Sequence, residues 1–106
     1  MENTDEIWTN LSAQIDVARE QPFKKDLLTT DSFNVALVSL GKNQEIPPHP
    51  ESYAVFFLVL EGSGTFLKKG REVSLEKQGS LYYEKNEQRG IKSDEKLILL
   101  GIQEPH

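Results

Sequence analysis

The sequence contains no cysteine. This absence excludes disulfide bonds, thiolate metal sites and cysteine nucleophiles. Long apolar runs are also lacking. The longest covers residues 53–60, whereas a membrane-spanning helix needs about 20 apolar residues. The first six residues are acidic where a secretory signal would be basic and then apolar. We therefore expect a cytoplasmic protein that does not enter a membrane.

The charge balance argues against nucleic acid as a partner. Asp and Glu outnumber Lys and Arg by 17 to 12, which leaves a net charge of −5 at pH 7. Binding to nucleic acid needs a basic face. Hydrophobic residues make up 37% of the 106 residues and charged residues 27%. This is an ordinary globular composition with room for one core.

From residue 25 onward the pattern is typical of β-strands, because short apolar segments alternate with Gly and Pro. The continuous apolar run over 53–60 predicts a strand buried on both faces. Glu61-Gly62-Ser63-Gly64 predicts a tight connection after it, and residues 46–50 hold too many prolines for a central strand. The predicted class is all-β, a sandwich or small barrel. The predicted strands cover 27–30, 33–40, 53–60, 65–67, 72–75, 80–84 and 96–102.

The N-terminal part of the chain follows a different pattern. Apolar residues recur at helical spacing over residues 3–13, and Asn3 or Thr4 can serve as the N-cap. We predict a short helical segment there, within a lead-in that covers residues 1–24. The β-barrel domain is predicted over residues 25–106.

Two stretches of the barrel segment resemble the signatures of the cupin superfamily. The first stretch is Gly41, then His49-Pro50-Glu51, then Val59-Leu60-Glu61-Gly62, and the second opens at Gly79. The resemblance covers roughly residues 25–106. It implies a double-stranded β-helix, or jelly-roll barrel, with a pocket between its two sheets. It also implies a homodimer.

The resemblance further implies what the metal positions should hold. Cupins that bind a metal use two His and a Glu from the first signature and a His from the second. In this sequence His49 is retained, while Glu51, Val55 and Gly90 stand in the other three positions. Since stable sites supply three or four protein ligands, we expect no metal cofactor. The alternative is a divalent transition metal on His49 and Glu51, with water or substrate in its other positions.

The pocket implied by the resemblance brings together candidate ligand-binding residues. Tyr82 and Glu84 share one face of the predicted strand, and in cupins this face is turned to the barrel interior. The guanidinium of Arg89 can meet a carboxylate ligand or pair with Glu51. The candidates are His49, Glu51, Tyr53, Tyr82, Glu84 and Arg89. The alternatives are tyrosines that only pack in the core and an Arg89 exposed in a loop over 85–90.

Three hypotheses about function follow. The first is a metal-free cupin that binds a small organic ligand in its barrel, or acts as a sensing or accessory module. The second is an enzyme of the isomerase or dioxygenase type with the reduced metal-ligand set, or a metal-free isomerase with His49 as general base and a tyrosine as acid. The third is a structural dimer with a vestigial pocket.

Overall fold

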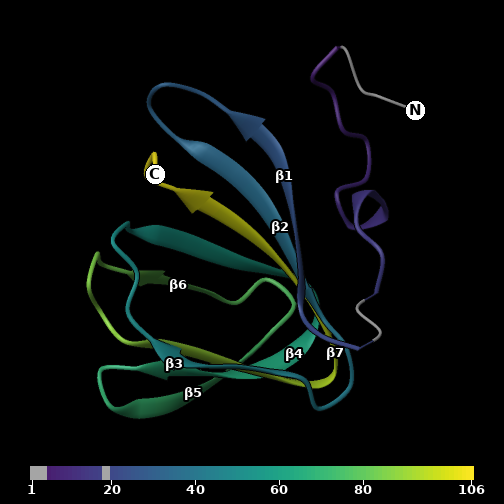
Figure 1. Cartoon of the computed structure of the whole chain (residues 1–106). Coiled ribbons are helices and arrows are strands. Elements are labelled where there is room, and N and C mark those ends of the chain that lie inside the picture. The colour runs from purple at the N-terminus through teal and green to yellow at the C-terminus, as the bar shows by residue number, and fades with distance from the viewer. Residues whose placement is uncertain (1–4, 18–19) are drawn as a thin grey trace.

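The computed structural model describes residues 5–17 and 20–106, and within them the chain is built from β-strands (Figure 1). The predicted all-β class is confirmed. The strands are β1 (Phe23–Thr29), β2 (Asn34–Leu40), β3 (Glu45–His49), β4 (Val55–Lys68), β5 (Arg71–Glu76), β6 (Ser80–Tyr83) and β7 (Arg89–Gln103).

The two long strands β4 and β7 form the spine of the molecule. They pair antiparallel along nearly their whole length, from Val55 opposite Gln103 to Leu67 opposite Gly90. Their neighbours change part-way along. In the first layer the order is β1-β2-β7-β4-β6, and in the second layer it is β3-β7-β4-β5. One continuous sheet is thus folded over on itself, as the jelly-roll prediction requires (Figure 1).

The fold-over takes place at Glu61-Gly62-Ser63-Gly64. The prediction of a tight connection here is wrong, because β4 runs through this stretch without a turn. Its register against β7 shifts twice, between Val59 and Glu61 and between Gly62 and Gly64. Such bulges bend a strand and increase its twist, so β4 can leave one layer and enter the other. The glycine-rich stretch marks a bend within one strand.

Gly62 is required at this bend by its conformation and its surroundings. Its φ is +80°, a region that favours glycine. A Cβ atom added here would lie 1.7 Å from the backbone carbonyl oxygen of Lys96 on β7. The two backbones can therefore approach this closely only because glycine has no side chain.

Other boundaries also differ from the predicted ones. Strand β7 begins at Arg89, so the predicted loop over 85–90 is wrong at its end. Strand β1 begins at Phe23, four residues before the predicted segment. The proline-rich β3 pairs only with β7 among the described strands and shifts register between Ile46 and His49. It lies at a sheet edge, as expected of a strand with two prolines.

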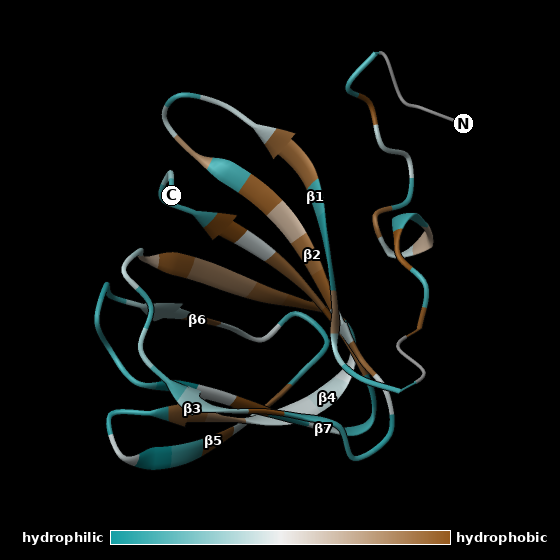
Figure 2. Cartoon of the chain, in the orientation of Figure 1, coloured by the Kyte–Doolittle hydropathy of each residue, from teal (hydrophilic) through white to brown (hydrophobic). Residues whose placement is uncertain are grey.

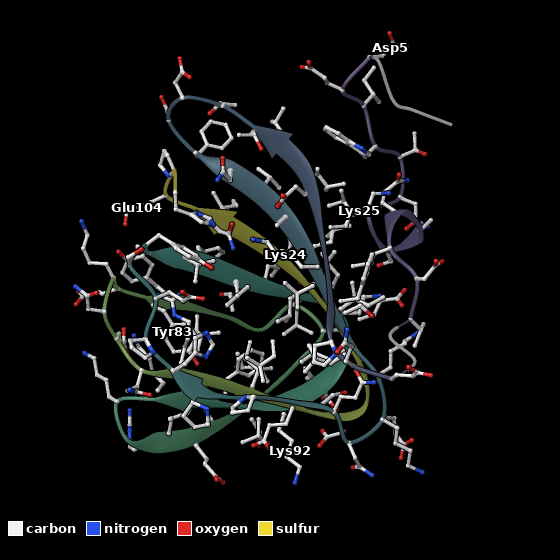
Figure 3. All side chains as sticks on the ribbon, in the orientation of Figure 1. Asp5, Lys24, Lys25, Tyr83, Lys92 and Glu104 are labelled. Carbon is white, nitrogen blue, oxygen red and sulfur yellow. The ribbon has the colours of Figure 1, made fainter. Side chains whose placement is uncertain are left out.

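The core lies between the two layers. Figure 2 shows apolar residues concentrated on β2, β4 and β7, and Figure 3 shows Tyr83 inside the barrel. The strand over 53–60 is not buried on both faces as predicted, because Phe56 points outward and is 42% exposed. The buried cluster consists of Val38, Leu40, Val55, Phe57, Val59, Phe66, Tyr83, Ile91, Leu97 and Leu99.

The N-terminal segment lies against the outer face of the first layer, where Ile15 is buried beside Leu37 and Ile98. The predicted helix over 3–13 is wrong within the described residues, which hold only a 3-10 turn at Ser12–Gln14. So short a helix needs a packed face to persist, and Ile15 beyond the predicted helix makes the buried contact. The proposed caps Asn3 and Thr4 lie outside the described residues.

No helix in the described ranges is long and apolar enough to cross a membrane.

We predict that Gly62→Ala destabilises the protein by about 3 kcal/mol or more, because strain at a positive φ adds to the collision with Lys96. Gly70→Ala is the matched control. Gly70 also has a positive φ, +75°, but an added Cβ meets no atom within 4 Å. This variant should lose only about 1 kcal/mol. Urea unfolding followed by circular dichroism measures the free energy of unfolding of both variants. Equal losses of stability would contradict the conclusion that the close approach of Gly62 to the Lys96 backbone excludes a side chain.

Candidate functional site

A cavity of about 250 Å³ opens between the two layers. Residues of the first layer, the second layer and the loop after β3 all contribute to its wall. The wall is mainly apolar and aromatic, with a few polar side chains among the apolar ones. The lining residues are Pro22, Phe23, Lys24, Val38, Ile46, His49, Glu51, Tyr53, Phe57, Arg89, Ile91 and Gln103.

Four of the six predicted ligand-binding residues line this cavity. His49 ends β3, and Glu51 and Tyr53 follow it in the loop. Arg89 begins β7 directly opposite His49 in the antiparallel pairing. The short spacing over 49–53 and the β3–β7 register therefore bring these side chains to one place.

His49 and Glu51 are partners in the cavity wall. The Nε2 atom of His49 lies 3.3 Å from Glu51 Oε2, and both side chains are somewhat more than a third exposed. His49 Nδ1 lies 2.9 Å from the carbonyl oxygen of Pro47. A carbonyl only accepts, so Nδ1 carries a hydrogen and donates it. Nε2 can then donate to Glu51 only when the ring is also protonated there.

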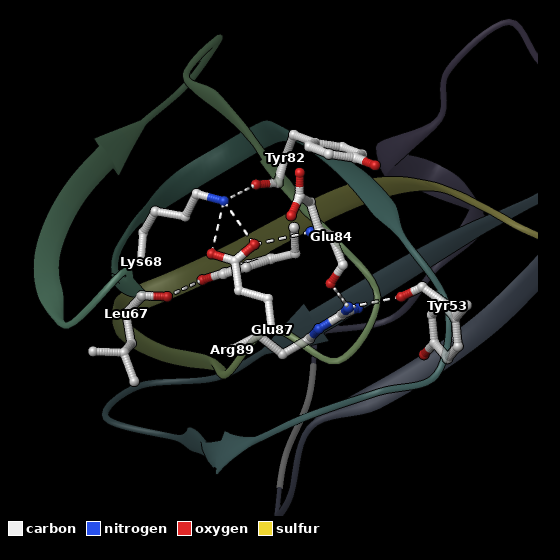
Figure 4. Close-up of polar contacts among 8 residues, drawn as sticks. Tyr53, Leu67, Lys68, Tyr82, Glu84, Glu87 and Arg89 are labelled. Carbon is white, nitrogen blue, oxygen red and sulfur yellow. Dashed lines mark hydrogen bonds and ion pairs between the residues drawn. The ribbon is translucent and has the colours of Figure 1, made fainter.

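Arg89 is buried, with only 4% of its surface exposed. The prediction of a loop arginine exposed to solvent is wrong. Its Nη2 donates to the carbonyl oxygens of Tyr53, at 2.7 Å, and Glu84, at 3.2 Å (Figure 4). Its guanidinium carbon lies 5.2 Å from the ring centre of Tyr53 and 5.3 Å from that of Tyr83.

No carboxylate of the described residues forms an ion pair with Arg89, so the predicted pairing with Glu51 is not made. The Nε atom of Arg89 is buried and has no hydrogen-bond partner within the described part of the chain. A guanidinium is always charged, and a buried charge normally has a partner of opposite sign. Among the described residues, the partners of this cation are neutral carbonyl oxygens and aromatic rings.

Tyr53 joins Arg89 to the C-terminal residues. Its ring stacks on that of His106, with centroids 3.7 Å apart and planes inclined by 8°. Burial raises the pKa of the Tyr53 hydroxyl, and the negative charge of Glu51 raises it further, against the opposing effect of Arg89. Tyr53 therefore stays a neutral hydrogen-bonding group at physiological pH.

Tyr82 and Glu84 do not line this cavity, and the predicted face of strand β6 is wrong. Tyr82 points outward and is 49% exposed, beside Phe56 on the neighbouring strand. The inward residue is Tyr83, which is fully buried and whose hydroxyl donates to the carbonyl oxygen of Leu67. Burial in the barrel raises the pKa of Tyr83 to about 12.

Glu87 is a structural residue that the sequence did not single out. Its carboxylate accepts a hydrogen bond of 2.8 Å from Lys68 Nζ and another of 2.9 Å from the backbone N–H of Glu84 (Figure 4). Burial raises the pKa of Glu87, but these bonds outweigh burial and hold the pKa below its usual 4.5. The turn that they close carries the Glu84 carbonyl to Arg89.

Gln103 and Lys24 are polar cavity residues that the sequence reasoning missed, and of the two Gln103 is buried. It is 4% exposed, and its Oε1 has no hydrogen-bond partner among the described residues. The alternation of the strand could have indicated its burial. Every second residue of a strand lies on the same face, so Gln103 shares the buried face of Leu97 and Leu99 on β7. A buried glutamine at the end of an apolar face is unusual enough to be noted.

The architecture can now be compared with known proteins. No family model matches the chain, and no curated protein matches it. A cupin superfamily protein from Desulfitobacterium hafniense is 16% identical with a TM-score of 0.81, over 91% of this chain and 88% of that one. An RmlC-like cupin from Desulfovibrio desulfuricans is 18% identical with a TM-score of 0.81, over 93% and 95%. The chain has a cupin fold.

Cupin folds of this shape also occur in enzymes. The polyketide cyclase RemF from Streptomyces resistomycificus is 18% identical with a TM-score of 0.75, over 82% of this chain and 67% of that protein. At these identities the comparison establishes the shared fold alone.

The metal positions of the resemblance hold few metal ligands in this structure. The described residues contain no group of three or more His, Cys, Asp or Glu side chains placed to hold one. Val55 stands where the resemblance would place a metal ligand, but it is 1% exposed and lies within the apolar cluster. At Gly90 an added Cβ would lie 3.2 Å from Pro48, so the strand leaves little space for a side chain. His49 and Glu51 are the two remaining side chains, and their Nε2 and Oε2 atoms lie 3.3 Å apart.

We predict that stability falls in acid as Glu87 is protonated. Its folded-state pKa is lowered, so its contribution is complete above about pH 4.5 and is lost as the pH falls through the lower folded value. Glu87→Gln should flatten this part of a plot of melting temperature against pH. Glu95→Gln is the control, because its ion pair with Lys42 is highly exposed. If Glu87→Gln keeps the wild-type slope, the Lys68–Glu87 pair is not what stabilises this turn.

Proposed function

We propose that this protein is a metal-free cupin that binds a small organic ligand in the cavity between its layers. The convergence of His49, Glu51, Tyr53 and Arg89 on one mainly apolar cavity carries this proposal. An apolar pocket with a few polar groups in fixed positions is the usual form of a small-molecule site. A sensing or accessory role is a finer version of the same proposal.

The donor set supports the metal-free part of the proposal. A divalent ion on His49 and Glu51 would gain only these two protein ligands. Stable sites supply three or four. Of the two cations that line this cavity, Lys24 and Arg89, the guanidinium of Arg89 is the buried one. The homodimer and the cytoplasmic location expected from the sequence stay predictions.

Filling the cavity tests the proposal. Ile46 lines it and lies on the edge strand β3, so Ile46→Trp should place an indole in the ligand's space. Val73→Trp is the matched control, at a half-buried position on β5 that does not line the cavity. We expect a library of small metabolites to contain compounds that raise the melting temperature of the wild type and of Val73→Trp.

Those shifts should be absent in Ile46→Trp. Chemical-shift mapping on the wild type should place the same compounds beside Phe57 and Ile91, which line the cavity. Compounds that stabilise Ile46→Trp as strongly as the wild type, or that perturb only the outer sheet face, would contradict binding in the cavity.

A further inference from the structure

We propose that the ligand of this cavity is a small carboxylic acid whose carboxylate is bound by Arg89. The inference rests on the proposed function and names the chemical class of the ligand. It comes from two buried polar atoms that the protein leaves unpaired, at the two ends of strand β7.

The first of these atoms is Nε of Arg89. Its side chain lines the cavity, is 4% exposed and has no ion-pair partner among the described residues. Two carbonyl oxygens occupy Nη2, while Nε is buried without a partner among the described residues. A buried charge without a counter-charge is costly. A carboxylate in the cavity would supply the missing counter-charge to the guanidinium.

The charges on the wall also favour an anion. Arg89 and Lys24 are the cations that line the cavity, and Glu51 is the carboxylate. His49 Nε2 lies 3.3 Å from that carboxylate. Lys24 has Asp26 at 3.8 Å, an exposed and loose pair. The wall therefore holds an excess of positive charge that a monoanion would match.

The second atom is Oε1 of Gln103, a buried acceptor without a donor among the described residues. A ligand that satisfies it needs an N–H or O–H group. Gln103 and Arg89 lie at opposite ends of β7, yet both line this one cavity. An acid that binds both residues should therefore also carry a hydroxyl or amino group.

The size and the apolar wall limit the rest of the molecule. The cavity volume of about 250 Å³ is below the range of drug-sized pockets, so one ring or a short chain fills it. Val38, Phe57 and Ile91 give this part of the wall its apolar character. A hydroxylated or aminated aromatic acid of one ring meets all three conditions.

Matched pairs of small acids and their amides test the inference on the unmodified protein. One such pair is 4-hydroxybenzoate and 4-hydroxybenzamide, which have the same shape and differ in charge. Calorimetry at neutral pH should find the acids at least about tenfold tighter, because charge-assisted hydrogen bonds are about twice as strong as neutral ones. The 4-methoxybenzoate ion lacks the donor for Gln103 and should bind several-fold more weakly than 4-hydroxybenzoate.

Arg89→Lys gives a second test, since it keeps a positive charge and removes Nε. This variant should reduce the preference for acids over amides at least about fivefold, whereas Arg71→Lys on an exposed position of β5 should not change it. The comparison of acids with amides on the wild type does not depend on Arg89→Lys folding.

The outcomes separate the two proposals. If amides bind in the cavity as tightly as acids, the carboxylate inference is overturned and the ligand-binding function stands. If Arg89→Lys folds and keeps the full preference for acids, Arg89 is not the recognising group. If neither class binds while other compounds of the metabolite library bind in the cavity, this inference is overturned and the ligand-binding function stands.

Discussion

The pairing of β4 with β7 is the constraint on which the cavity depends. A straight strand of 15 residues, the length of β7, would span about 50 Å, which is more than the longest 41 Å dimension of the molecule. The strand instead follows β4 around the bend at Gly62, where the Lys96 backbone passes too close for any side chain. As a result, Arg89 at one end of β7 and Gln103 at the other line the same cavity.

A buried cation with neutral partners organises the polar side of that cavity. The Tyr53 and Glu84 carbonyls, from the loop after β3 and the turn after β6, meet at the Arg89 guanidinium. Lys68 and Glu87 hold the second of these segments in place. In this account a fixed guanidinium supplies the positive charge in the cavity, and no metal site is needed.

The fold could be predicted from the sequence because turn residues and alternation report local structure. The bend at Gly62 could not, since Glu61-Gly62-Ser63-Gly64 suits a turn as well as a pair of bulges, and only pairing with β7 decides between them. The face of β6 was predicted wrongly because Tyr82 and Tyr83 are alike, and a one-residue change in alternation exchanges inside and outside. His49, Glu51 and Tyr53 were found because their spacing is local, whereas the burial of Arg89 depends on segments far apart in the chain.

Elemental analysis of the untagged protein by plasma mass spectrometry, with His49→Ala beside it, distinguishes Arg89 from a metal ion as the fixed cation of the cavity. If Arg89 is that cation, neither sample contains a transition metal in near-stoichiometric amounts. A near-stoichiometric metal in the wild type that is lost in His49→Ala would contradict it.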